Sequence, residues 1–232
     1  IGGGGLCTGV STLAKLLNPK IRVIGVEPAE ANCMQESLKA GHVVALSDVN
    51  TIADGTAVKR PGEKLFPYIQ QNVDEIITVE DSELIVAFLD MVENHKMIVE
   101  NSGLLTVAAL KHLDVKKKKI VSILSGGNMD VITMSSVVQH GLIQRDRIFT
   151  VSVLLPDKPG ELAKVSSLLA EEKGNVIKLE HNQFISINRN AAVELRITLE
   201  AEGTEHKNRI VQALNDAGYR PKLVKSKGVY SD

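Results

Sequence analysis

The stretch Ile1-Gly2-Gly3-Gly4-Gly5-Leu6 opens the sequence and decides its fold class. Four consecutive glycines leave their backbone N–H groups unhindered, and apolar residues at helical spacing follow from Leu6 to Leu17. Amides that converge at a helix N-terminus can hold an anion, because the positive end of the helix dipole lies there. The sequence therefore predicts a phosphate cradle, with a flexible glycine turn as the alternative.

The first part of the chain alternates helices with strands. Helical periodicity covers residues 6–17, 32–40, 81–96, 102–113 and 130–139, whereas residues 21–26, 74–79 and 120–124 are rich in β-formers. Thr78 and Asp81 have the spacing of a capping box. The alternation favours an α/β domain with a parallel sheet covered on both faces, and ligands are expected beyond the carboxyl ends of its strands.

The pattern changes after Arg147. The order becomes strand, helix, strand, strand, helix, strand, with expected elements at residues 149–155, 161–173, 175–188, 193–199, 204–217 and the final residues, and a hairpin at 188–190. This is the order of a ferredoxin-like α+β domain. The sequence therefore predicts two domains, at residues 1–143 and 148–232.

Composition excludes several classes of function. The 232 residues carry a net charge of −1 and are 44% hydrophobic, so the chain has no overall attraction for nucleic acid or anionic membranes. No apolar run is long enough to cross a bilayer. Cys7 and Cys33 cannot form a disulfide framework or a structural zinc site, which favours a cytoplasmic protein. Because Ile1 leads directly into glycines, we expect the chain to begin within a domain.

A dinucleotide site is a rival interpretation of the opening residues. Gly3, Gly5 and Gly9 fit a loosened glycine fingerprint, and Glu27 ends the next expected strand, where an acidic residue would hold a ribose. The segment Ser125-Gly126-Gly127-Asn128 adds a hydroxyl at another strand end, which a nicotinamide site does not require. An NAD-dependent dehydrogenase stays open as an alternative that predicts NAD binding.

Five motifs, in order, resemble the threonine ammonia-lyase family. They are the tetraglycine loop with Gly9, Val26-Glu27-Pro28, Thr51-Ile52-Ala53-Asp54-Gly55, Glu100-x-Ser102-Gly103 and Ser125-Gly126-Gly127-Asn128. The tail Leu155-Pro156-Asp157-Lys158-Pro159-Gly160-Glu161-Leu162 resembles an ACT regulatory domain. The resemblance implies the C-terminal part of a three-layer PLP (pyridoxal 5′-phosphate) fold type II domain, similar to tryptophan synthase β, followed by a ferredoxin-like ACT domain.

The resemblance also implies a cofactor site and a reaction. Gly2, Gly3, Gly4, Gly5 and Leu6 would hold the phosphate of PLP, and Ser125, with Gly126, would meet its pyridine nitrogen. A neutral hydroxyl cannot keep that nitrogen protonated as a carboxylate would, and the weaker electron sink suits β-elimination. The implied reaction converts L-threonine to 2-oxobutanoate and ammonia, with L-serine as a further substrate.

Two features of the family have no counterpart in the sequence. The Schiff-base lysine lies in a Ser-x-x-Lys-x-Arg-Gly-Ala context before the glycine loop, and no lysine here has those neighbours. We therefore predict no catalytic residue in this chain and no activity of the chain alone. Glu27, Ala31 and Cys33 have the spacing of a cation site, but Cys33 replaces its Asp and a thiol is a poor ligand for magnesium or calcium, so no metal is predicted.

The ACT resemblance implies a regulatory amino-acid site and a homo-oligomer, either a dimer or a tetramer. Its predicted effector-binding residues are Asp157, Lys158, Gly160, Leu162 and Asn175. One alternative is that this domain only dimerises. Another is that the whole segment is an amino-acid sensor without catalysis.

Overall fold

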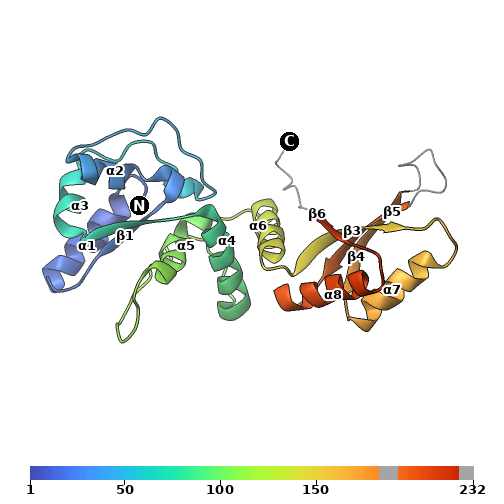
Figure 1. Cartoon of the computed structure of the whole chain (residues 1–232). Helices are drawn as coiled ribbons and strands as arrows, with labels where there is room; N and C mark the ends of the chain where they lie inside the picture. The colour runs from blue at the N-terminus through green and yellow to red at the C-terminus, as the bar shows by residue number, and fades with distance from the viewer. Residues whose placement is uncertain (183–192, 225–232) are drawn as a thin grey trace. The chain divides into compact units, whose positions relative to one another are not determined.

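The computed structural model describes residues 1–182 and 193–224, which form two compact units (Figure 1). The first unit comprises Ile1–Val138 and the second Gln139–Asp232, so the helix α6, Val131–Gln144, contains the division. No helix among the described residues is both long and apolar enough to span a bilayer.

The first unit is an α/β unit built around a parallel pair of strands, β1 and β2. The two strands pair in register from Ile24 opposite Glu75 to Pro28 opposite Val79. Helices alternate with these strands, as the sequence predicts. The elements are α1 Gly5–Leu17, β1 Ile24–Pro28, α2 Cys33–Ala40, α3 Phe66–Asn72, β2 Glu75–Val79, α4 Asp81–Asp90 and α5 Asn101–Ala108, with short turns at Ala29–Ala31, Asp54–Thr56, Met91–His95 and Ala109–His112.

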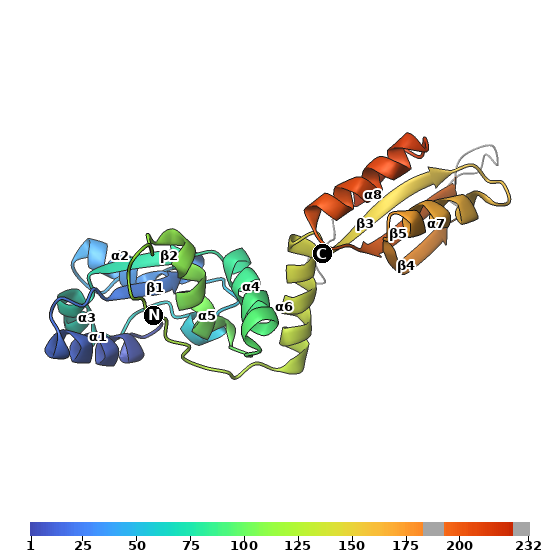
Figure 2. The same cartoon turned by 90° about the horizontal axis from the view of Figure 1, so that it is seen from below.

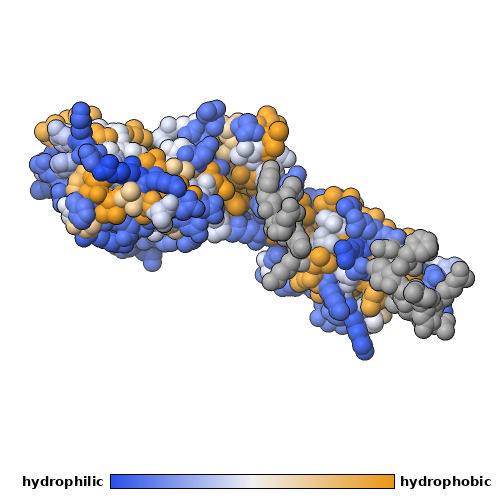
Figure 3. Space-filling view, turned by 90° about the horizontal axis from the view of Figure 1, so that it is seen from above, coloured by the Kyte–Doolittle hydropathy of each residue, from blue (hydrophilic) through white to orange (hydrophobic). Residues whose placement is uncertain are grey.

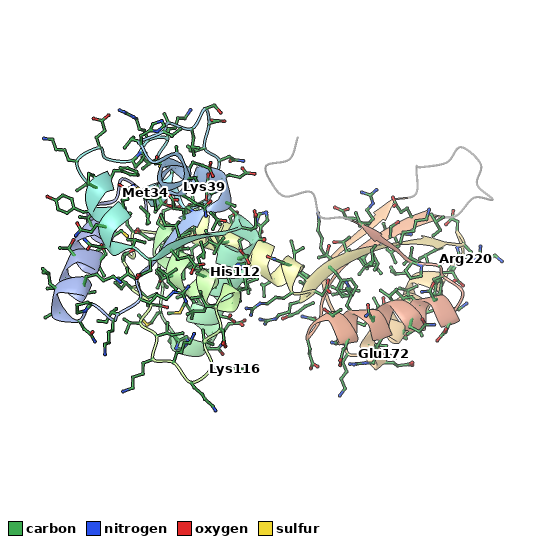
Figure 4. The ribbon with its side chains drawn as sticks, turned by 60° about the vertical axis from the view of Figure 1, so that its left-hand side comes forward. Met34, Lys39, His112, Lys116, Glu172 and Arg220 are labelled. Atoms are coloured by element: carbon green, nitrogen blue, oxygen red, sulfur yellow. The ribbon has the colours of Figure 1, made fainter. Side chains whose placement is uncertain are left out.

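Two groups of buried side chains stabilise this unit. One lies where α4 and α5 pack against β1 and β2, and includes Leu84, Phe88 and Leu104, all fully buried. The other holds α2 against α3 through Met34, labelled in Figure 4, and Ile69. Burying such side chains contributes roughly 1.5–3 kcal/mol each, which fixes the helices that surround the glycine loop.

The capping box lies at different residues from those predicted. Glu80 is the N-cap of α4, and Glu83 completes the box by accepting the N–H of Glu80 at 2.7 Å. Asp81 instead accepts hydrogen bonds from the Thr51 hydroxyl at 2.6 Å and the Ile52 N–H at 2.9 Å. Its carboxylate therefore ties the loop before Gly55 to the start of α4.

The segment 120–124 is extended but forms no strand among the described residues, contrary to the prediction. A strand needs a neighbouring strand for its ladder of hydrogen bonds, and the described sheet of this unit contains only β1 and β2. The segment is attached to α5 instead, because the Thr106 hydroxyl donates to the Ile123 carbonyl at 3.1 Å. Conversely, α3 has no counterpart in the prediction, although Pro67 in its first turn is a typical start signal.

The second unit has ferredoxin-like topology, as predicted. Its elements are β3 Ile148–Leu155, α7 Glu161–Glu171, β4 Asn175–Asn182, β5 Val193–Glu200, α8 Thr204–Asp216 and β6 Lys222–Val224. The antiparallel pairings give the strand order β4-β5-β3-β6, and both helices cover one face (Figures 1 and 2). Alternate residues of β5 are buried beneath those helices, as the period of two requires. The last part of the expected strand 175–188 and the hairpin 188–190 lie outside the described residues.

A partly buried ion pair stabilises the entry to this second unit. Asp146 accepts hydrogen bonds from the Lys207 ammonium at 2.7 Å and the Thr204 hydroxyl at 2.8 Å, so it ties the residues before β3 to the start of α8. The bond from Lys207 holds the pKa of Asp146 below its ordinary value, against the opposing effect of burial.

We predict that Asp146→Asn lowers the free energy of unfolding by about 1 kcal/mol at pH 7. Because the folded pKa is depressed, the carboxylate stabilises the fold above the unfolded pKa of about 3.9, and this contribution disappears as the pH falls through the folded value. Urea unfolding of the wild type and variant between pH 7 and pH 3 measures the difference. Asp157→Asn, at an exposed turn, is the control, and a difference that persists undiminished at pH 3 would contradict the assignment.

Candidate functional site

A cavity of about 340 Å³ lies along β1 in the first unit and is bounded by segments far apart in the sequence. Residues of the glycine loop, β1, the 55–56 turn, α5 and the 123–125 segment line it. They are Ile1, Gly2, Gly3, Gly4, Gly5, Leu6, Cys7, Val10, Val23, Ile24, Gly25, Val26, Gly55, Thr56, Glu100, Ser102, Leu105, Thr106, Ile123 and Ser125. The cavity volume is within the range typical of small-ligand sites.

The N-terminus of α1 opens into this cavity without a side-chain cap. Gly4 is the N-cap residue, and no side chain bonds the free amides of the first turn, which also lacks acidic residues. Gly4 has a φ of 99°, a conformation that glycine adopts without strain. The described cavity wall contains no lysine, arginine or histidine. An anion here would therefore be held by backbone dipoles, as the sequence predicts for the tetraglycine loop.

Ser125 lines the same cavity as the glycine loop, so the structure brings Gly2–Gly5, Leu6 and Ser125 together. Gly126 is placed differently and does not line the cavity. A Cβ added to Gly126 would lie 2.4 Å from the Glu100 carboxyl carbon, and one added to Gly103 would lie 3.2 Å from the Gly126 amide nitrogen. Gly126 therefore allows the 125–128 segment to approach the start of α5.

Glu100 connects these two segments. Its N–H donates to the Gly126 carbonyl at 3.2 Å, and its carboxylate accepts the N–H of Asn128 at 2.9 Å. Glu100 also lines the cavity, together with Thr56, Ser102 and Thr106, and none of these four was predicted as a site residue. Glu100 and Ser102 belong to a motif quoted above, but the sequence alone does not show that this motif lines the same cavity as the glycine loop.

Glu27 is fully buried and caps a helix. Its two carboxylate oxygens accept the N–H groups of Met34 at 2.9 Å and Gln35 at 2.8 Å in the first turn of α2. Burial raises the pKa of Glu27, while the two hydrogen bonds oppose that rise. Burial also raises the pKa of the Cys33 thiol to about 11, which disfavours the thiolate that metals bind.

Among residues 1–182 and 193–224, no three His, Cys, Asp or Glu side chains converge to form a metal site. Glu27 already uses both oxygens for backbone amides, and Cys33 is a protonated neighbour at neutral pH. These residues therefore do not fit a divalent cation, and the absence of a metal stays a prediction.

The predicted effector residues of the second unit are not all together. Asp157, Lys158, Gly160 and Leu162 form the turn before α7, where Gly160 is the N-cap. Asn175 lies at the opposite end of the sheet, because it shares the partner Glu200 with Ile148 at the start of β3. The α7 crossover makes β4 parallel to β3 and returns the chain to the end where β3 began. One copy of the chain therefore cannot bring Asn175 to the turn.

A separate hollow of about 430 Å³ lies beside the turn in the second unit. It is lined by Pro156, Glu161, Lys164, Leu168, Ala217, Gly218 and Tyr219. The Tyr219 hydroxyl donates to Glu161 at 3.3 Å, and Glu161 also pairs with Lys164 at 2.7 Å. None of the five predicted effector residues is among the described residues that line this hollow.

The first unit combines an α/β fold, a glycine loop at an uncapped helix N-terminus and a serine that lines the same cavity. These features define a protein that binds a phosphorylated, flat cofactor. A profile of the family described as pyridoxal-phosphate dependent enzyme matches residues 1–126. The chain belongs to this family.

Relatives of the chain carry consistent names. It is 38% identical over 227 residues to an L-threonine ammonia-lyase of Geobacter sulfurreducens and 34% identical over 225 residues to one of Thermotoga maritima, and each alignment covers 97% of this chain and 56% of the relative. The processed form of threonine deaminase isoform 2 from Solanum lycopersicum superposes with a TM-score of 0.57 at 38% identity, covering 60% of this chain and 42% of that chain. The chain thus spans about half the length of the curated relatives it matches. The predicted relationship to PLP fold type II and to threonine ammonia-lyases is confirmed.

We predict that Gly4→Ala destabilises the first unit by about 1–3 kcal/mol and weakens anion binding. Alanine disfavours the left-handed backbone, and its Cβ would lie 2.9 Å from Ile69 Cδ1 and 3.1 Å from Met34 Cε. Gly9→Ala is the matched control, because a Cβ there meets nothing within 4 Å and α1 should gain about 0.5–1 kcal/mol. Urea unfolding of both variants measures their stability. Equal effects of the two substitutions would contradict the assigned role of Gly4.

Proposed function

We propose that the whole protein is a PLP-dependent threonine ammonia-lyase, which converts L-threonine to 2-oxobutanoate and ammonia and also accepts L-serine. The support is the meeting of the tetraglycine loop and Ser125 in one cavity. The names of the relatives, L-threonine ammonia-lyase and threonine deaminase, support the same activity. The two free, separate cysteines fit the cytoplasmic location that we propose.

We assign two roles to this chain in cofactor binding. The amides of Gly2–Gly5 and Leu6 would hold the phosphate, since the uncapped end of α1 supplies donors and the positive end of a dipole. Ser125 would meet the pyridine nitrogen, and the packing of Gly126 against Glu100 would hold Ser125 in place. When bound, PLP withdraws electrons from the α-carbon of an amino acid. A hydroxyl at the nitrogen moderates that withdrawal because it cannot keep a positive charge there.

We further propose that the Schiff-base lysine lies outside the printed sequence. Among the described residues that line the cavity there is no lysine. Residues 1–232 would then bind the cofactor through hydrogen bonds but would not turn over substrate.

We predict that the full-length protein binds PLP and releases 2-oxobutanoate from L-threonine, and that Ser125→Ala lowers kcat at least tenfold. Bound PLP is measured by its absorbance after dialysis, and 2-oxobutanoate by a coupled assay. Ser122→Ala is the control, since the Ser122 hydroxyl bonds the Thr106 carbonyl and does not line the cavity. Binding of NAD without PLP would refute the proposal and favour a dehydrogenase.

We propose that the second unit is an ACT domain that binds an amino-acid effector. Its ferredoxin-like topology supports this role. The open N-terminus of α7 at Gly160 would receive the effector carboxylate, flanked by Asp157, Lys158 and Leu162. Because Asn175 lies at the other end of the sheet, it would act from a second copy in a homo-oligomer.

We predict that isoleucine, valine or threonine binds this unit and that Gly160→Ala weakens binding at least tenfold. Gly160 and Gly218 both have positive φ, 91° and 86°, and a Cβ at either meets nothing within 4 Å. Gly218→Ala therefore imposes similar strain without touching the turn before α7. Calorimetric titration of the two full-length variants compares their affinities for the effector. A greater loss of affinity in Gly218→Ala would indicate that the effector binds in the neighbouring hollow instead.

A further inference from the structure

Two buried hydroxyls of the first unit, those of Thr8 and Ser102, have no hydrogen-bond partner among the described residues, and of these two only Ser102 lines the cavity. Ser102, the second residue of α5, is 9% exposed, and its Oγ is buried without a donor or acceptor among the described residues. Leaving such a group unsatisfied is costly, so an unpaired hydroxyl in a folded protein indicates a missing partner.

The other hydroxyls of this cavity wall on the α5 side are already paired within the protein. Thr56 donates to the Ala53 carbonyl at 2.9 Å, and Thr106 donates to the Ile123 carbonyl at 3.1 Å. Ser102 lines the same cavity but makes no such bond. The Ser102 hydroxyl therefore differs from those of Thr56 and Thr106, because its proton is not used in a hydrogen bond to any described residue.

Gly55 packs directly against Ser102, and this close approach requires a residue without a side chain at position 55. A Cβ added to Gly55 would lie 2.8 Å from Ser102 Oγ and 3.7 Å from Glu100 Oε1, so both oxygens face a residue that has no side chain. Asp81 anchors the loop before Gly55 through Thr51 and Ile52, which keeps that loop in place. The Glu100 carboxylate is occupied by the Asn128 amide rather than by Ser102.

We infer that Ser102 is a cofactor-contacting residue, whose hydroxyl donates a hydrogen bond to an oxygen of PLP bound in this cavity. The inference rests on the proposed function, since it takes PLP as the occupant. PLP offers oxygen acceptors on its phosphate and on its ring, whereas the Ser102 proton has no acceptor among residues 1–182 and 193–224. Ser102 thus adds a third contact, from α5, to those of the glycine loop and Ser125.

The test compares two buried serines, one whose hydroxyl forms hydrogen bonds within the protein and one whose hydroxyl does not among the described residues. Ser37 is fully buried in α2, where its Oγ donates to the Cys33 carbonyl at 2.7 Å and accepts the Val44 N–H at 2.9 Å. Ser102→Ala removes no bond from the unliganded protein, so its urea unfolding midpoint without PLP should be unchanged or higher. Ser37→Ala should lower that midpoint and leave PLP affinity unchanged.

Affinity is measured by equilibrium dialysis of the full-length protein against PLP, with pyridoxal and inorganic phosphate as further probes. We expect Ser102→Ala to raise the Kd for PLP about five- to tenfold, the effect of one hydrogen bond. A parallel loss for pyridoxal assigns the contact to a ring oxygen, and a parallel loss for phosphate assigns it to the phosphate.

Three outcomes separate this inference from the function on which it rests. If the wild type binds PLP and Ser102→Ala binds it equally well, the hydroxyl contacts only water and the inference is overturned while the function stands. If the wild type binds no PLP, the proposed function fails and the inference fails with it. If Ser102→Ala is less stable without PLP, Ser102 has a partner in the protein and the inference is again overturned.

Discussion

The site depends on the free N-terminal amides of α1. A helix leaves its first N–H groups without intrahelical partners, and here no side chain satisfies them. Gly4 gives the chain the left-handed conformation needed to enter the helix, and it lies tightly against Ile69 and Met34 of the smaller buried cluster. The position of the cradle is therefore set by packing between α2 and α3, because those helices determine where the loop can turn.

Close approach of backbone segments arranges the rest of the cavity. Gly103 and Gly126 allow α5 and the 125–128 segment to come together, and Glu100 joins them through two backbone groups. Asp81 performs a similar task for the loop before Gly55. Each wall is thus held by a carboxylate or a glycine that does not itself provide the anion cradle. Each unit also has hydrophobic side chains at its surface (Figure 3).

Much of this arrangement could be predicted from the sequence because its signals are local. The glycine run, the helical spacing that follows it and the order of helices and strands along the second unit all depend on neighbouring residues. Helix α3 escaped prediction because its pattern is short. The segment 120–124 has the composition of a strand, but pairing depends on a neighbour that the pattern does not identify.

Contacts between distant segments could not be predicted. Nothing local shows that Glu83 rather than Asp81 completes the capping box, or that Ser102 lines the same cavity as the tetraglycine loop. The placement of Asn175 shows the same limit, since its position in the following strand did not show that it lies at the other end of the sheet from the turn. The effector roles of Asp157, Lys158, Gly160, Leu162 and Asn175 therefore stay predictions, as do the cofactor roles of the glycine loop and Ser125.

The described cavity wall offers an anion no cationic side chain, and its donors are backbone amides and hydroxyl groups. The field of a dipole decays faster with distance than that of a charge, so an anion is attracted only once it is close. Dissolved salt, which mainly screens long-range fields, should therefore alter the capture rate little. Every residue type except proline carries a backbone N–H donor, so side chains around the loop could change in evolution without loss of these donors.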